Sequence, residues 1–436
     1  GLVTGGLEIP TIVYDTAEQA VNLPSFPDEI RPFIRKIFVE DYPEVVSLHA
    51  LDAGNLSLTL GYVSLRLREG ETLPRARRIF QISPLDTQHL SDICALLTKE
   101  GFIERTDLSP NGRHQYGLAA YLVPRSKPNS LGRLIVDFST INPLIESPPS
   151  VIPDLAQTLQ FLEGKALYTG LDLRYAFMSL RLSPDSRSLM TFLTPAGTYV
   201  WLSLPTGWTN SPALYQEKCT KMLHYEVVRD EKGEPIWDSE NEVRLVSDPL
   251  EHSRNFFDDI TVASKGKPTY HDTLEEHFVC LAQTVSRLHF HGARINVPKC
   301  EFARPRILFL GWVITKSYCI ADPRRVAKVR EFEFPTSKKQ LRSFLGLVNS
   351  LRRVIPMEVI SQVGILTPLT SSKAPFEPQD KHRTAFEQVK DMLTSEPLYN
   401  NLMSPTAPKY LWVDASTSSG TLGGVLAQKV GGDLDE

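Results

Sequence analysis

The sequence lacks long apolar runs and has few cysteines. It contains no stretch of about eighteen consecutive apolar residues, so we expect no membrane-spanning helix and no membrane partner. The five cysteines are scattered and form no Cys-x-x-Cys pair. This spacing argues against a disulfide framework or a zinc site and is typical of reducing surroundings. The cysteines are Cys94, Cys219, Cys280, Cys300 and Cys319.

An excess of basic charge is also missing, because the net charge is −4. Phosphate contacts usually require a basic face, so binding of nucleic acid would require the positive charges to be segregated. Two stretches are locally basic, although an ordinary solvated surface is the alternative for each. They contain Arg66, Arg68, Arg75, Arg77 and Arg78, and Lys338, Lys339, Arg342, Arg352 and Arg353.

Length and hydrophobic content indicate a multidomain protein. The chain has 436 residues, of which 42% are hydrophobic, and this is enough for about two to four domains or subdomains. The first residue is Gly1 rather than Met, and no secretory pattern follows it. We therefore expect either an engineered fragment or a product cut from a polyprotein.

An acidic pair inside an apolar stretch is the most informative feature. Asp258 and Asp259 interrupt residues 255–262, which predicts a strand, a tight turn at the acidic pair and a second strand. Two carboxylates at a hairpin tip repel each other unless a cation neutralises them. A third carboxylate, Asp172, follows a similar apolar segment, and strand pairing would bring it to the same sheet edge as Asp258. Such an edge could hold two divalent ions for phosphoryl transfer, whereas an ordinary acidic turn is the alternative for the pair alone.

Seven sequence blocks occur in a fixed order over about three hundred residues. They are 122–125 with 133–138 and 141–142, 171–173 with 176–177, 204–213, 256–259, 299–302, 309–312, and 341–347. In these blocks the chain resembles the reverse transcriptases of long-terminal-repeat retroelements, most closely the Ty3/gypsy (metavirus) type. Each block alone is weak evidence, but their common order is specific.

The resemblance implies an α+β fold shaped like a right hand, with fingers, an antiparallel palm sheet and a thumb. The first strands of a ribonuclease H-like domain would follow. The expected regions are an N-terminal extension (1–60), fingers and entry to the palm (61–165), palm (166–317) with a second fingers part (178–205) and a charged insertion (229–254), a helical thumb (318–405), and an incomplete ribonuclease H-like segment (406–436).

Local patterns predict the elements within these regions. Helices are expected at 26–38, 84–100 with Ser83 as N-cap, 154–162, 211–226 and 271–292, and around Phe386, Val389 and Leu393. Asp322-Pro323 and Pro335-Thr336 are each expected to cap a further helix that follows them. Strands are expected in 118–142 with a turn at 126–132, in 175–205 with a turn at 195–197, and on both sides of Gly311. The insertion is predicted to be a surface loop or an extra hairpin.

The resemblance assigns metal-dependent roles to the acidic residues. Asp172 and Asp258 would bridge two Mg²⁺ ions, with Mn²⁺ as an alternative, and Asp259 would be the third carboxylate. The backbone of Leu173 would be a further metal ligand. The primer 3′-hydroxyl would then attack the α-phosphate of the incoming nucleotide.

Four residues are candidates for contact with the nucleotide through their side chains. The aromatic ring of Phe177 would lie under the sugar and exclude a 2′-hydroxyl, although a plain core Phe is the alternative. Arg133 falls where the family has a triphosphate-binding arginine, and guanidinium suits bidentate phosphate contact. A second cation should come from the fingers turn, either Arg125 or Lys127. A solvated turn charge is the alternative for all three cations.

Further residues are expected around the nucleotide and the primer. Gly207 would let the backbone approach the nucleotide closely. Its neighbour Thr206 departs from the family, which has a larger Phe or Gln there. Phe256 replaces the more common Tyr and would pack on the primer end. The primer-positioning hairpin would contain Leu310, Gly311 and Trp312, with a purely structural hairpin as the alternative.

The end of the sequence resembles the start of a retroelement ribonuclease H domain. Residues 410–416 would be its first strand with the catalytic Asp414, and residues 422–427 its second strand. The remaining acidic ligands are not present, and one carboxylate cannot hold two metals. We therefore expect no ribonuclease H activity from this chain.

Three functions are compatible with these observations. The first is an RNA- and DNA-dependent DNA polymerase, with an RNA template, a DNA primer, an RNA/DNA hybrid and deoxynucleoside triphosphates as partners. The second is a non-catalytic scaffold subunit of a reverse transcriptase dimer, either a homodimer or a heterodimer with a longer form. The third is a domesticated RNA-binding fold, which the three intact aspartates disfavour. The resemblance implies a cytoplasmic location, in a virus-like particle.

Overall fold

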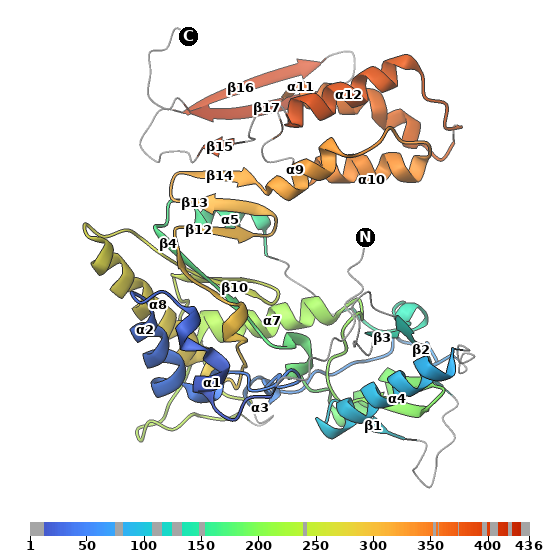
Figure 1. Ribbon diagram of the computed structural model, residues 1–436. Helices are drawn as coiled ribbons and strands as arrows, with labels where there is room; N and C mark the ends of the chain where they lie inside the picture. The colour runs from blue at the N-terminus through green and yellow to red at the C-terminus, as the bar shows by residue number, and fades with distance from the viewer. Residues whose placement is uncertain are drawn as a thin grey trace. The chain divides into compact units, whose positions relative to one another are not determined.

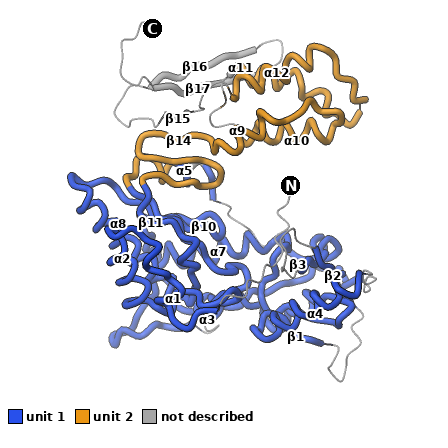
Figure 2. The backbone as a smooth tube through the Cα atoms, viewed as in Figure 1, with its two compact units in different colours: residues 1–159, 167–304 blue, residues 160–166, 305–436 orange. Residues whose placement is uncertain are grey.

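The computed structural model divides the chain into two compact units (Figures 1 and 2). Unit 1 contains Gly1–Leu159 and Leu167–Arg304, and unit 2 contains Gln160–Ala166 and Pro305–Glu436. The residues that the structure describes are 13–74, 82–106, 116–123, 133–147, 153–238, 242–351, 355, 357–373, 375–394, 399–401, 409–416 and 421–428. Within them, no helix combines the length and apolar character needed to cross a membrane.

A four-stranded antiparallel sheet lies at the centre of unit 1. Its strands, in spatial order, are β11 (Glu301–Arg304), β4 (Leu167–Asp172), β10 (Asp259–Ser264) and β9 (Ser253–Phe256). The predicted pairing of the two acidic segments is confirmed. Asp172 lies opposite Asp259, and Asp258 lies with Phe257 in the two-residue turn that joins β9 to β10. The turn at the acidic pair is therefore wrong by one residue, because a two-residue hairpin loop leaves Asp259 inside the strand.

Two long helices cover this sheet. The helix α8 (Tyr270–Phe290) packs on β10 and β4, and α7 (Ser211–His224) packs on β9. Apolar residues recur along α8 with the 3.6-residue period of a helix, and this apolar stripe is buried; its members are Leu274, Phe278, Leu281, Val285 and Leu288. A buried polar residue, His277, joins this helix to both inner strands. Its ring nitrogens lie 2.7 Å from the Thr169 hydroxyl on β4 and 2.9 Å from the Ser264 hydroxyl on β10.

The second sheet of unit 1 has five strands. In spatial order they are β1 (Ile103–Arg105), β6 (Gly197–Trp201), β5 (Thr191–Thr194), β2 (Leu118–Val123) and β3 (Arg133–Val136). Helix α4 (Pro84–Lys99) packs on it, and Ser83 caps the helix as predicted. The turn predicted at 126–132 lies outside the described residues.

The strand predicted before residue 190 is wrong. This segment is helical, in η5 (Ala176–Ser179), α6 (Pro184–Arg187) and η6 (Ser188–Met190). Proline fixes the φ angle at a helical value and needs no N–H partner in the first turn, so Pro184 favours a helix start there.

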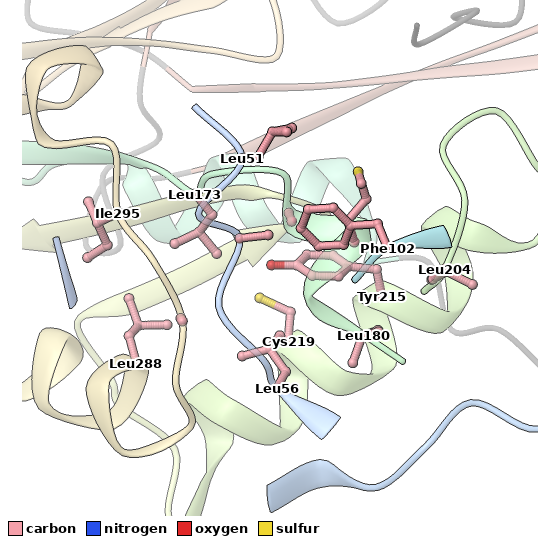
Figure 3. Packing of buried hydrophobic residues seen from close by; sticks show 14 of the residues in the cluster. Leu51, Leu56, Phe102, Leu173, Leu180, Leu204, Tyr215, Cys219, Leu288 and Ile295 are labelled. Carbon is pink, nitrogen blue, oxygen red and sulfur yellow. The ribbon is translucent and has the colours of Figure 1, made fainter. Parts of the chain in front are cut away.

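The N-terminal segment packs into the core of unit 1. It contains α1 (Ala17–Val21), α2 (Arg31–Arg35) and a π-helical stretch, Lys36–Asp41, so the helix predicted at 26–38 begins and ends later than expected. The ring of Phe33 stacks on Phe278 of α8 with centroids 4.6 Å apart. In the same core, Leu51 and Leu56 lie near Leu173, Tyr215 and Cys219 (Figure 3).

The segment predicted as a charged insertion contributes one strand of a hairpin, whereas its status as an insertion stays a prediction. Strands β7 (Tyr225–Val227) and β8 (Leu245–Ser247) pair antiparallel. Polar contacts attach the hairpin to the body of unit 1, and two of them come from the segment before β8. Glu242 forms an ion pair with Lys218 of α7 at 3.7 Å, and the Val243 N–H donates to the Thr59 carbonyl at 3.1 Å.

Unit 2 combines a small antiparallel sheet with helices. Its elements are β12 (Arg306–Phe309), β13 (Trp312–Thr315), β14 (Tyr318–Ala321), β15 (Tyr399–Asn401), α9 (Pro323–Arg330), α10 (Lys338–Asn349), α11 (Met357–Leu366) and α12 (Asp380–Thr394). Asp322 caps α9 as predicted, whereas Ser337, not Pro335-Thr336, caps α10. The rings of Phe344 and Phe386 pack at 4.5 Å between α10 and α12.

The last described strands form a separate antiparallel hairpin. Strands β16 (Lys409–Ser416) and β17 (Thr421–Gln428) occur where the sequence predicted two strands, and Asp414 lies opposite Gly423. The assignment of this hairpin to a ribonuclease H-like domain stays a prediction.

Burial of His277 predicts an acid-sensitive fold. Burial, with the neighbouring His252 adding to it, lowers the pKa of His277 from 6.5 to about 4. The unfolded chain therefore binds the proton more readily, and the free energy of unfolding should fall as pH falls from about 6.5 to about 4, by up to about 1.4 kcal/mol per pH unit for this group. Urea unfolding over this pH range measures the slope.

His277→Gln should reduce that slope. His271→Gln, which removes an exposed histidine from the same helix, is the control. An unchanged slope in His277→Gln would show that other groups cause the acid sensitivity.

Candidate active site

Three carboxylates converge at one end of the central sheet of unit 1. Asp172 ends β4, Asp259 begins β10 directly opposite, and Asp258 occupies the adjoining turn. Partial burial, with the charges of Asp258 and Asp172, raises the pKa of Asp259 to about 6. Partial burial and the charge of Asp172 also raise the pKa of Asp258. The three ionised groups therefore repel one another, and a divalent cation would relieve that repulsion.

The donor set fits Mg²⁺ ions that are held partly by substrate. Among the described residues, no group of three or more His, Cys, Asp or Glu side chains is arranged so that it could hold a metal ion by itself. Magnesium usually takes one or two carboxylates and completes its shell with waters and phosphate oxygens. Asp258 and Asp259 retain solvent-exposed surface despite their partial burial, so this end of the sheet is accessible to a substrate.

The backbone after β4 is compatible with the predicted role of Leu173. The Arg174 N–H donates to the Arg294 carbonyl, and the Asn296 N–H donates to the Asp172 carbonyl. These two hydrogen bonds lie on either side of Leu173, so the Leu173 carbonyl takes no part in the pairing with residues 294–296.

The turn that carries Asp258 has an unusual conformation. Phe257 has a φ angle of 55°, which non-glycine residues rarely adopt, and such strain persists only where the surroundings hold it. The Gln216 side chain of α7 does so, since its Oε1 atom accepts the Phe257 N–H at 2.6 Å. Gln216 is only 2% exposed and did not emerge from the sequence. A polar residue on the buried face of a helix is the sequence signal that could have identified Gln216.

Phe177 lies in η5, just after the first acidic strand. Its ring is half-buried and packs edge-to-face against Tyr215 of α7, with centroids 5.3 Å apart and an interplanar angle of 74°. Tyr215 is fully buried. The inner edge of Phe177 is thus fixed by the core, while part of the ring stays accessible.

The other predicted nucleotide-binding residues are less completely described. Gly207 is exposed with a φ angle of 89°, and a Cβ atom there would meet nothing within 4 Å, so the backbone conformation explains the glycine. Its neighbour Thr206 is half-buried. The backbone of Arg133 lies opposite Val123 at the start of β3. Arg125 and Lys127 lie outside the described residues.

The predicted primer-binding residues fall in both units. In unit 1, Phe256 ends β9 opposite Asp259, and its ring packs edge-to-face on Phe257 at 4.9 Å. In unit 2, Leu310 and Gly311 form the turn between β12 and β13, with φ angles of 49° and 81°.

Two positive φ angles are typical of the tight hairpin turns that suit twisted strands. The next residue, Trp312, is only 2% exposed. Any direct contact between this hairpin and a primer would therefore be made by the turn residues Leu310 and Gly311.

Part of the predicted basic clusters has a structural role. In unit 2, the Lys338 ammonium donates to the Ser371 carbonyl at 2.7 Å, and the Arg342 guanidinium donates to the Thr370 carbonyl at 2.6 Å. Five further members lie outside the described residues. They are Arg75, Arg77, Arg78, Arg352 and Arg353.

The geometry defines a class of protein. Carboxylates gathered at the open end of an antiparallel strand pair are suited to two-metal phosphoryl transfer, the chemistry of nucleotide polymerases. Residues 127–314 match the family described as reverse transcriptase (RNA-dependent DNA polymerase). These residues therefore form a domain similar to reverse transcriptases, and the relatives that share it include polyproteins of retroviruses and transposons.

Two curated relatives come from a retrovirus and a transposon. The Gag-Pol polyprotein of woolly monkey sarcoma virus is 30% identical over 71% of this chain. A retrovirus-related Pol polyprotein from transposon 297 of Drosophila melanogaster is 25% identical over 72% of it. The chain spans only 17% and 27% of these two polyproteins.

A solved structure has the same fold. The foamy viral protease-reverse transcriptase in complex with dsDNA superposes with a TM-score of 0.70 at 19% sequence identity. The match covers 95% of this chain and 78% of that one. This likeness confirms the predicted α+β polymerase fold.

Repulsion among the carboxylates predicts that Asp259→Asn stabilises the metal-free chain. Because the pKa of Asp259 is raised from 3.8 to about 6, its ionisation destabilises the fold increasingly between these two pH values and fully above about pH 6. Because the side chain is exposed and water screens it, the gain should be at most about 1 kcal/mol. Urea unfolding at neutral pH with a chelator measures it.

Added Mg²⁺ should then stabilise the unmutated chain more than it stabilises the Asp259→Asn variant. The reason is that a ligand stabilises the fold only by binding to the folded state, and the variant lacks one of the carboxylates. Asp391→Asn, an exposed position on α12, is the control. If Asp259→Asn is less stable than the unmutated chain in chelator, the repulsion is not a net cost.

Proposed function

We propose that this chain is an RNA- and DNA-dependent DNA polymerase that uses two divalent metal ions. The carrying observation is the convergence of Asp172, Asp258 and Asp259 at the open end of the central sheet, where their charges repel. A solely structural acidic turn gives no reason for three carboxylates to share one end of a strand pair.

Each residue then has a distinct task. Asp172 and Asp258 would hold the ions, with Asp259 as the third carboxylate. When bound, the ions would activate the primer 3′-hydroxyl and neutralise charge on the triphosphate and on the departing pyrophosphate. Phe177 would exclude a 2′-hydroxyl, and Arg133 would hold the triphosphate.

The proposed partners follow from this chemistry. They are an RNA template, a DNA primer, their hybrid and deoxynucleoside triphosphates, bound mainly through the nucleic-acid backbone. Two related solved structures contain dsDNA and an RNA/DNA hybrid, which supports nucleic-acid partners here. Dimerisation and a location in cytoplasmic virus-like particles are further parts of the proposal. The complete acidic site does not favour the scaffold-subunit alternative.

Extension of a DNA primer on an RNA template tests the proposal. The unmutated chain should extend the primer with deoxynucleotides and Mg²⁺, and Asp258→Asn should abolish extension. Both reactions should be repeated with Mn²⁺ and over a range of protein concentrations, because a dimer would be concentration-dependent. No extension under any of these conditions would reject the catalytic function and favour the scaffold subunit.

Phe177→Ala should relax sugar selection. Removing the ring leaves space for a 2′-hydroxyl, so incorporation of ribonucleotides relative to deoxynucleotides should rise by about tenfold or more, equivalent to about 1.4 kcal/mol of lost discrimination. Single-nucleotide incorporation kinetics with both sugars measure this ratio. Phe161→Ala, which removes a phenylalanine of α5 (Leu155–Leu162), is the control. If Phe177→Ala still excludes ribonucleotides, the ring does not select the sugar.

A further inference from the structure

The site carboxylate Asp172 is held by a residue from a distant part of the chain. Asn296 follows α8 in sequence and is only 3% exposed. Its side-chain Nδ2 donates to Asp172 Oδ2 at 2.8 Å, and its backbone N–H donates to the Asp172 carbonyl at 2.8 Å. The same residue therefore fixes both the backbone and the side chain of Asp172.

The orientation of the Asn296 amide is determined by its two partners. The Arg174 guanidinium donates from Nη2 to Asn296 Oδ1 at 3.1 Å. A guanidinium can only donate hydrogen bonds, and an ionised carboxylate can only accept them. Only one orientation of the amide satisfies both, so its NH₂ group must face Asp172.

A further layer holds Arg174 in place. Its Nε donates to the Ser47 hydroxyl at 3.2 Å, and the Ser47 N–H donates to the Ile295 carbonyl at 2.9 Å. The Asp172 N–H also donates to the Cys300 sulfur at 3.3 Å. Ser47 belongs to the N-terminal segment, so three segments distant in sequence meet behind one carboxylate.

We propose that Asn296 is a positioning residue that fixes the rotamer of Asp172, and that Arg174 and Ser47 hold Asn296 in turn. This inference rests on the metal-binding role that the proposed function gives to Asp172. Partners behind a metal ligand orient it and typically contribute about 10–100-fold to metal affinity or activity. With Oδ2 bonded to the amide, the carboxylate cannot rotate freely, and its remaining lone pairs point in a fixed direction.

The principal test measures metal binding without substrate. Mn²⁺ is titrated into the full chain, and free Mn²⁺ is followed by electron paramagnetic resonance. Asn296→Ala should weaken Mn²⁺ binding about 10–100-fold. Asn296→Asp keeps the volume but presents an acceptor to Asp172, so it should weaken binding as well. Asn255→Ala is the matched control, because Asn255 is 4% exposed on β9 and its Nδ2 has no hydrogen-bond partner among the described residues.

Kinetics and stability separate positioning from general damage. In primer extension, Asn296→Ala should lower kcat and raise the Mg²⁺ concentration for half-maximal rate, with little change in KM for the nucleotide. Thermal unfolding identifies any variant that fails to fold, and the isosteric Asn296→Asp replaces Asn296→Ala in that case. Arg174→Leu should give a smaller loss that is not additive with Asn296→Ala, because both act through one amide.

Two results would overturn the inference. One is a Mn²⁺ affinity of Asn296→Asp that equals the affinity of the unmutated chain or of the Asn255→Ala control. The other is unaltered Mn²⁺ binding in Asp172→Asn. A chain whose Mn²⁺ affinity depends on Asp172 and Asn296 but that extends no primer would reject the proposed function and leave this inference standing.

Discussion

Mutual repulsion among three carboxylates is the constraint on which the architecture of unit 1 depends. Burial and the neighbouring carboxylate charges raise the pKa of Asp258 and Asp259, so the strands that carry these residues must be held together by other contacts. Helix α8 supplies part of that support through its buried apolar stripe and through His277, which bonds to both inner strands. The packing behind the site therefore offsets the destabilisation that the carboxylates cause.

Two buried amides provide the finer control of geometry. Gln216 accepts the N–H of the strained turn, and Asn296 donates to the carboxylate of the opposite strand. Apolar packing has no direction, whereas a hydrogen bond fixes both distance and angle. A site that must hold ligands for metal ions therefore needs polar contacts inside an otherwise apolar core.

The N-terminal segment contributes more than its sequence suggested. Residues 13–65 carry few strong patterns, yet they pack on α8 through Phe33 and reach the back of Asp172 through Ser47 and Arg174. Its folding and the order of the acidic site should therefore be coupled, because residues in one hydrogen-bond network share their energetics.

The sequence by itself determined the local features. Helix caps such as Ser83 and Asp322, the stripe of α8 and the acidic hairpin all depend on residues close together in the chain, so periodicity and turn chemistry predict them. Only the tertiary structure decided that Asp259 rather than Asp258 lies opposite Asp172, and that Asn296 holds this carboxylate from 124 positions away. Strand register and long-range polar contacts depend on the simultaneous packing of distant segments, which no local pattern encodes.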